Sequence, residues 1–146
     1  MNIHESAEDY LEAILMLKQR VGSVRSIDIA NELGYTKASI SIAMKKFREN
    51  EYIEVDEDGY ITLTKKGHAI ATKVYERHRI LSQFFISLGV SKENATNDAC
   101  KIEHDLSEET FNAIKKKVVR KIAKKEEHKK EGSKKEGSNK ETLKTK

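Results

Sequence analysis

The chain has 146 residues, of which 36% are charged, and a mean hydropathy of −0.70. This length favours one small compact domain with an appendage over two independent domains. No apolar run approaches the roughly 20 residues of a membrane span, and the N-terminus lacks the basic and apolar segments of a secretory signal. Cys100 is the single cysteine, so an internal disulfide is excluded and we expect a protein of the reducing cytoplasm.

Positive charge is concentrated at one end of the chain. Residues 115–146 hold 14 Lys and Arg against 5 Glu, whereas the remaining residues hold 14 Lys and Arg against 19 acidic residues. The pI of about 9.0 therefore does not describe a uniformly basic surface. Any DNA-binding segment has to be found from its local pattern.

The first half of the chain has the pattern of a winged helix-turn-helix. Apolar residues at helical spacing predict a helix over residues 6–20, with Ser6 as its cap. Ser26 is predicted to cap a short helix, IDIANEL, and Thr36 opens a second one, KASISIAMKKFREN, after a glycine turn. The strand-like segments YIEV and YITLT flank a DEDG turn in which Gly59 can take a positive φ, which predicts a β-hairpin wing.

The second half of the chain is predicted to be helical. Residues 65–88 form one long amphipathic pattern that Gly89 ends, and a further helix is expected from about Ser91 to Leu106. A third helix begins near Ser107, and its apolar stripe stops near residue 125. The fold class is therefore mainly α: an N-terminal winged helix-turn-helix with a two-stranded wing, followed by an all-helical region.

The second helix of the helix-turn-helix carries the candidate DNA contacts. Its short polar side chains can approach base edges in the major groove, and its lysines can contact phosphates. A solvated basic helix face is the alternative for the lysines. The six candidate DNA-binding residues are Thr36, Lys37, Ser39, Ser41, Lys45 and Lys46.

Three of the predicted helices carry side chains that bind metals. In DACKIEHDLS a thiol, a carboxylate and an imidazole lie at i, i+3 and i+4, on one helical face. The first helix adds two carboxylates, and the long helix adds a histidine. The six candidate metal ligands are Asp9, Glu12, His78, Cys100, Glu103 and His104. Asp9 could instead belong to a capping box with Ser6, and Glu12 could be a solvated helix charge. Cys100 could be a small buried apolar group, and His78 a surface histidine.

Five segments together carry a family resemblance. They are EDYLEAILML, IDIANELGYTKASIS, LTKKGHAIA, RHRIL and DACKIEHDLS, and they cover residues 8 to about 107. In their order and spacing the chain resembles the diphtheria-toxin-repressor and manganese-transport-regulator family. The resemblance implies a transcriptional repressor, not an enzyme, that binds operator DNA when the six candidate ligands hold Mn2+ or Fe2+, with Co2+ or Zn2+ as surrogates. It also implies control of genes for metal homeostasis.

The candidate ligands combine features of two subgroups of that family. Manganese-type members are similar at Asp9 and Glu12 but usually carry a carboxylate in place of Cys100, whereas iron-type members are similar at Cys100. The ancillary site of iron-type members is not expected here, because Ser82 and Thr96 stand where its ligands would be. The SH3-like domain of iron-type members is not expected either, because a lysine-rich segment follows the predicted helices. The resemblance thus implies the short, manganese-regulator architecture.

The organisation expected from these patterns has three parts. Residues 1–71 form the DNA-binding domain, residues 72–125 the metal-binding and dimerisation domain, and residues 126–146 a lysine-rich, disordered tail. The apolar residues between Val74 and Ile122 exceed the needs of one small helical layer, so we expect a homodimer on double-stranded operator DNA. A winged-helix regulator that responds to a small molecule or a partner protein without metal is one alternative, but it leaves the ligand pattern unexplained. A metallohydrolase is a second, and it leaves the wing unexplained.

Overall fold

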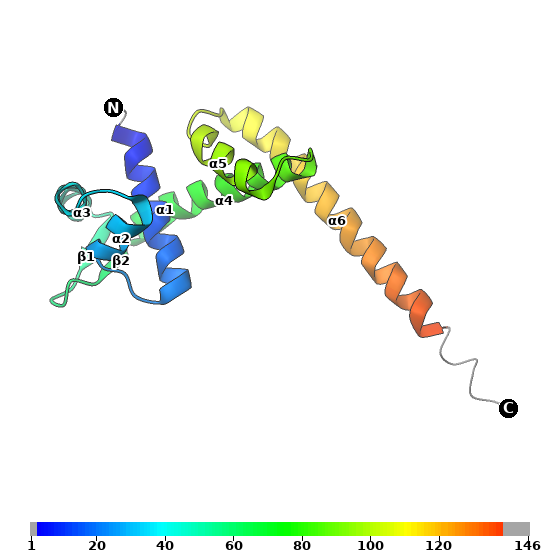
Figure 1. Cartoon of the computed structure of the whole chain (residues 1–146), viewed down its shortest axis with the longest axis horizontal. Helices are drawn as coiled ribbons and strands as arrows, with labels where there is room; N and C mark the ends of the chain where they lie inside the picture. Colours follow the sequence, from blue (N-terminus) through cyan, green and yellow to red (C-terminus); the bar gives the residue numbers. More distant parts are fainter. Residues whose placement is uncertain (1–2, 139–146) are drawn as a thin grey trace.

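The computed structural model describes the backbone of residues 3–138 and the side chains of residues 7–129. The described part consists of α1 (Ile3–Val21), α2 (Ser26–Leu33), α3 (Lys37–Glu49), β1 (Ile53–Val55), β2 (Ile61–Leu63), α4 (Lys65–Ser87), α5 (Lys92–Ile102) and α6 (Glu108–Ser138). Helices α1 to α3 and the hairpin lie together at one end, and α4 leads from them to α5 and α6 (Figure 1). The predicted fold class is confirmed.

The winged helix-turn-helix is built around one apolar core. Each of its elements contributes a side chain that is almost inaccessible to solvent: Leu11 from α1, Ile29 from α2, Ile40 from α3, Ile53 from β1 and Ile61 from β2. Full burial of one such side chain contributes roughly 1.5–3 kcal/mol. The shared core therefore fixes the position of α3 relative to the other elements at this end of the molecule.

Two helix starts differ from those predicted. Ser6 lies inside α1, which begins at Ile3, and Ser26 is the first residue of α2 rather than its cap. The N-cap of α2 is Arg25, whose backbone N–H donates to the Asp28 carboxylate at 2.8 Å. This acidic side chain at the third helical position anchors the start of the helix, so a serine hydroxyl is not needed there.

The wing fixes the direction in which α4 leaves the DNA-binding unit. Strands β1 and β2 pair antiparallel, with Ile53 opposite Leu63. At the start of α4, a Cβ on Gly67 would lie 2.0 Å from the carbonyl oxygen of Tyr52, so only glycine permits this approach. The hairpin and α4 are therefore joined at a close backbone contact.

Helix α4 connects the DNA-binding unit to the helices α5 and α6. It packs against α1 near its beginning and against α5 and α6 further along (Figure 1). A second, smaller core forms around its far end, where Ile80 packs with Phe111 and Val118 of α6. Phe84 and Ile114 border this core and are only partly buried. Among the described residues, no helix is both long and apolar enough to cross a membrane.

The ends of α5 and α6 also differ from the sequence predictions. Helix α5 stops at Ile102 instead of Leu106, and α6 continues to Ser138. The segment 126–138, predicted to be disordered, is therefore helical in the structure; residues 139–146 of the predicted tail lie outside the described residues. Most of residues 124–136 are lysine or glutamate, which have high intrinsic helix propensity even without tertiary contacts. The prediction of disorder relied on the absence of an apolar stripe and did not weigh this propensity.

Candidate metal centre

The turn between α5 and α6 is held by a partly buried arginine of α4. Arg77 Nη1 donates to the carbonyl oxygens of Glu103 (2.8 Å) and Leu106 (3.1 Å), and Nη2 donates to Glu108 Oε1 at 2.8 Å. Its guanidinium also lies over the Phe111 ring, 5.1 Å from the centroid. Glu103 is thereby fixed through its backbone, which leaves its side chain directed into the molecule.

Glu103 meets a histidine and the cysteine on one side. His78 Nδ1 lies 3.1 Å from Glu103 Oε2, and the Glu103 side chain is completely inaccessible to solvent. Potential ligand atoms of His78, Cys100 and Glu103 all lie within 4.8 Å of one another. Although Cys100 as a whole residue is exposed, its sulfur atom therefore faces this group.

A second group forms on the other side of Glu103. His104 Nε2 lies 3.0 Å from Asp9 Oδ1 on α1 and 3.4 Å from Glu103 Oε1. The ligand atoms of Asp9, Glu103 and His104 again lie within 4.8 Å of one another. Two three-ligand groups thus share one buried carboxylate, and together they connect α1, α4 and the end of α5.

Glu12, the sixth candidate, is buried beside these groups without completing either of them. It is 6% exposed, and its Oε1 has no hydrogen-bond partner. Burial, followed by the charge of Glu103, raises the pKa of the Glu12 carboxyl from 4.5 to about 7. Glu103 Oε1 likewise lacks a hydrogen bond. Two buried carboxylate oxygens without donors fit a site for a cation, because unpaired buried polar atoms are otherwise costly.

Three further candidate ligands, Cys100, His78 and His104, also have raised pKa values. Burial, followed by the charge of Glu103, raises the pKa of the Cys100 thiol to about 11. The hydrogen bond to Glu103 raises the pKa of His78. Burial lowers the pKa of His104, but nearby carboxylates, first of all Glu8, outweigh this effect and raise it. The cluster is thus rich in negative charge and attracts either protons or a metal cation.

Glu8 was not among the residues predicted from the sequence. Its Oε2 lies 2.6 Å from His104 Nδ1, on the opposite edge of the imidazole from Asp9. Glu8, Glu103 and His104 also line a cavity of about 200 Å³ together with Lys73 and Arg77. In the sequence, a role for Glu8 was indicated only by its place next to Asp9. Helical periodicity alone places adjacent residues on different faces of a helix, so it did not predict that both would contact His104.

The six candidate DNA-binding residues lie on exposed positions of α3 and its cap. Ile40, Met44 and Phe47 bury the opposite face. Thr36 is the N-cap: its Oγ1 accepts from the Ser39 backbone N–H at 3.2 Å and donates to the Ser39 hydroxyl at 2.9 Å. These two hydroxyls therefore also fix the start of the helix.

Ile42 is a second residue that sequence reasoning missed. It lies on the polar side of α3 and is 61% exposed. An exposed apolar side chain at this place can contact a thymine methyl group in the major groove. The signal was an apolar residue outside the buried stripe of Ile40 and Met44.

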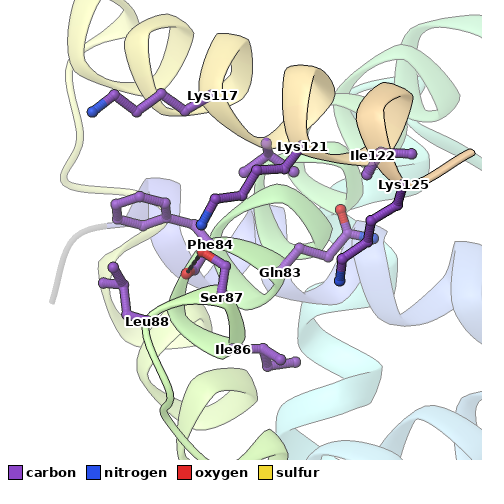
Figure 2. Close-up of a pocket in the computed structure, with 10 residues that line it drawn as sticks. Gln83, Phe84, Ile86, Ser87, Leu88, Lys117, Lys121, Ile122 and Lys125 are labelled. Carbon is purple, nitrogen blue, oxygen red and sulfur yellow. Dashed lines mark hydrogen bonds between the residues drawn. The ribbon is translucent and has the colours of Figure 1, made fainter. Parts of the chain in front are cut away.

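An apolar groove lies between the end of α4 and α6. Phe84, Ile86 and Leu88 line it at the end of α4, and Ile122 lines it from α6 (Figure 2). Leu88 is 64% exposed and Ile122 is 41% exposed. Figure 2 shows lysine side chains of α6, at positions 117, 121 and 125, along the same groove.

Comparison with known families agrees with this geometry. Residues 2–69 match the model of the N-terminal DNA-binding domain of iron-dependent repressors, and residues 64–130 match that of their metal-binding and dimerisation domain. The chain belongs to the iron-dependent repressor family. The predictions of a metal-dependent DNA-binding repressor and of a homodimer are thereby confirmed.

Individual relatives support the same assignment. The chain is 34% identical to the HTH-type transcriptional regulator MntR of Bacillus subtilis over 135 residues, which cover 84% of this chain and 95% of that protein. It is 36% identical to the transcriptional regulator MntR of Escherichia coli O157:H7 over 111 residues, covering 76% and 72%. These relatives are named as regulators, in agreement with the prediction that the chain is not an enzyme.

Solved structures extend the likeness to the fold. A manganese-dependent transcriptional repressor in complex with manganese matches with a TM-score of 0.71 at 26% identity, over 77% of this chain and 52% of that chain. The manganese regulator SloR matches with a TM-score of 0.68 at 25% identity, over 77% and 53%. The chain therefore spans about half the length of these two proteins.

Proposed function

We propose that Asp9, Glu12, His78, Cys100, Glu103 and His104 hold the regulatory metal of this repressor. The observation that carries the proposal is the convergence of five of these residues, from α1, α4, α5 and the turn after α5, into two three-ligand groups that share buried Glu103. The sixth residue, Glu12, lies beside them with an unpaired buried oxygen. Carboxylate and imidazole ligands suit Mn2+ and Fe2+, and a thiolate shifts the preference toward Fe2+.

The coupling to DNA binding follows from where the ligands are attached. Asp9 and Glu12 belong to α1 of the DNA-binding unit, whereas His78 is on α4 and Glu103 directly follows α5. Without a cation, the carboxylates of Asp9, Glu12 and Glu103 oppose the approach of these elements. A bound divalent cation supplies the opposite charge. Ligation then favours one position of α1 and α3 relative to the helical part, so metal and operator favour the same state.

The DNA-binding function is assigned to α3. Its exposed Ser41 and Ile42 offer a hydroxyl and an apolar group to base edges, and Lys45 and Lys46 offer charge to phosphates. We propose that the second copy of the chain covers the groove formed by Leu88 and Ile122, because this groove is an exposed apolar surface within the segment that matches the family's dimerisation domain. Since the partner is chromosomal DNA, we infer a cytoplasmic location.

Metal dependence is tested with purified, chelator-treated protein and DNA selected from a random pool in the presence of Mn2+. Affinity is measured anaerobically with and without Mn2+, Fe2+, Co2+ and Zn2+. We expect Glu103→Ala and His104→Ala to abolish the metal response while the dimer persists, because each removes a ligand but little apolar packing. Glu93→Ala, at an exposed position early in α5, is the matched control.

The outcomes separate the proposal from its rivals. Unchanged metal response in both ligand variants would refute the assigned site. Equal operator affinity with and without metal would favour the metal-independent regulator. For the interface, Leu88→Ser combined with Ile122→Ser should raise the dimer dissociation constant in sedimentation; an unchanged constant would place the second copy elsewhere.

A further inference from the structure

His104 is held between two carboxylates that approach its two nitrogens from α1. Asp9 lies on the Nε2 side, with Glu103, whereas Glu8 lies on the Nδ1 side at 2.6 Å. The His104 side chain is 8% exposed, and that of Glu8 is 39% exposed. Glu8 therefore lies on the solvent side of the ring, outside both three-ligand groups.

We propose that Glu8 is a positioning residue for the metal centre. Its carboxylate accepts the Nδ1–H of His104 and so assigns the proton to Nδ1. This leaves the lone pair on Nε2, the nitrogen that faces Asp9 and Glu103, available to an ion. The inference rests on the proposed function, in that it takes His104 as a ligand through Nε2.

The geometry favours positioning over direct ligation by Glu8. The two ring nitrogens point in divergent directions, so a carboxylate bonded to Nδ1 is directed away from an ion bound at Nε2. A carboxylate on the far nitrogen fixes the ring orientation and increases the basicity of the ligand nitrogen. Loss of such a partner typically lowers metal affinity 10-fold to 100-fold.

The same hydrogen bond also connects the two parts of the switch. Glu8 is on α1, in the DNA-binding unit, and His104 lies in the turn after α5. This hydrogen bond is short, and its histidine side is mostly shielded from solvent. Its acceptor is charged, which makes it stronger than a hydrogen bond between neutral groups. Glu8 thus aligns α1 with the turn through a contact that does not itself require the ion.

The experiment compares wild type, Glu8→Gln and Glu8→Ala as full-length protein. The first readout is the His104 tautomer in the metal-free state, from long-range 1H–15N NMR correlations at pH 9. The second is Mn2+ affinity at pH 7.5, from competition with a fluorescent chelator. Glu93→Gln is the control for loss of one exposed negative charge.

We expect the Nδ1–H tautomer in the wild type and its loss in Glu8→Ala, together with a 10-fold to 100-fold fall in Mn2+ affinity. Glu8→Gln retains a carbonyl acceptor, so it should keep the tautomer and recover part of the affinity. An Nε2–H tautomer in the wild type, or unaltered affinity in Glu8→Ala, would overturn the proposal. Absence of Mn2+ binding by the wild type itself would instead refute the proposed function, and the tautomer measurement distinguishes the two failures.

Discussion

Replacement of Glu12 by Gln should stabilise the metal-free protein at neutral and alkaline pH. The Glu12 side chain is buried, and its pKa is raised from 4.5 to about 7, chiefly by burial. Such a difference corresponds to about 3 kcal/mol between the protonated and ionised forms. Because the side chain retains some contact with solvent, we expect about 2 kcal/mol. The amide of Glu12→Gln can also donate to the unpaired Oε1 of Glu103.

The sign of the pH dependence follows from the direction of this shift. A pKa that is higher in the folded than in the unfolded state means that the folded protein binds the proton more tightly. The contribution of Glu12 to stability is therefore lost as the pH rises from 4.5 toward 7 and stays lost above it. The stability difference between Glu12→Gln and wild type should be about 2 kcal/mol at pH 8 and below about 1 kcal/mol at pH 5.

Urea unfolding of chelator-treated protein, at one protomer concentration, measures this difference. Excess Mn2+ should stabilise the wild type by mass action and should stabilise Glu12→Gln much less, because a ligand is lost. Glu49→Gln, at an exposed position of α3, is the control. A variant that is less stable than wild type at pH 8, or equally different from it at pH 5 and pH 8, would refute the assignment of a buried, strained carboxylate.

Three further predictions concern protons, metal preference and DNA. Because the pKa values of His78 and His104 are raised, Mn2+ has to displace protons, so its affinity should increase from pH 6 to pH 8. Identical calorimetric heats in two buffers of different ionisation enthalpy would show that no proton is released. Cys100→Glu should shift operator activation toward Mn2+ and weaken it for Fe2+ under anaerobic conditions, and an unchanged metal ranking would show that the thiol does not set selectivity. The wing tip is exposed and acidic, so reversing charge with Glu57→Lys and Asp58→Lys should raise affinity for random-sequence DNA and steepen its salt dependence. An unaltered salt slope would mean that the wing lies away from the phosphates.

Most of the fold could be predicted because its signals are local. The apolar spacing of α1 and α4, and the Thr36 cap of α3, depend on residues close in sequence. The end of α5 does not. There, Arg77, which is 26 residues away in the sequence, donates a hydrogen bond to the backbone carbonyl of Glu103. The helix ends at Ile102, four residues earlier than the spacing of apolar residues predicted.

The residues of the candidate site could also be predicted, but their separation into two three-ligand groups could not. Residue type and spacing pointed to Cys100, Glu103 and His104 as one face of a helix. Because α5 ends at Ile102, the last two of these residues lie outside the helix. His104 accordingly faces α1, while Cys100 remains beside His78. Glu8 could not be assigned from spacing, since its partner is 96 positions away.

Unfavourable free energy in the metal-free cluster is what the proposed switch requires. A cluster that buries one oxygen each of Glu12 and Glu103, the two Oε1 atoms, without a hydrogen-bond donor stores unfavourable free energy in the metal-free fold. A metal that relieves this repulsion has a differential affinity for the assembled state, which is the requirement for shifting an equilibrium between two states. Replacing the carboxylates by apolar residues would give a more stable protein that no longer distinguishes metal from its absence. On this argument, the free energy gained in Glu12→Gln and the metal response lost in the same variant have a single cause.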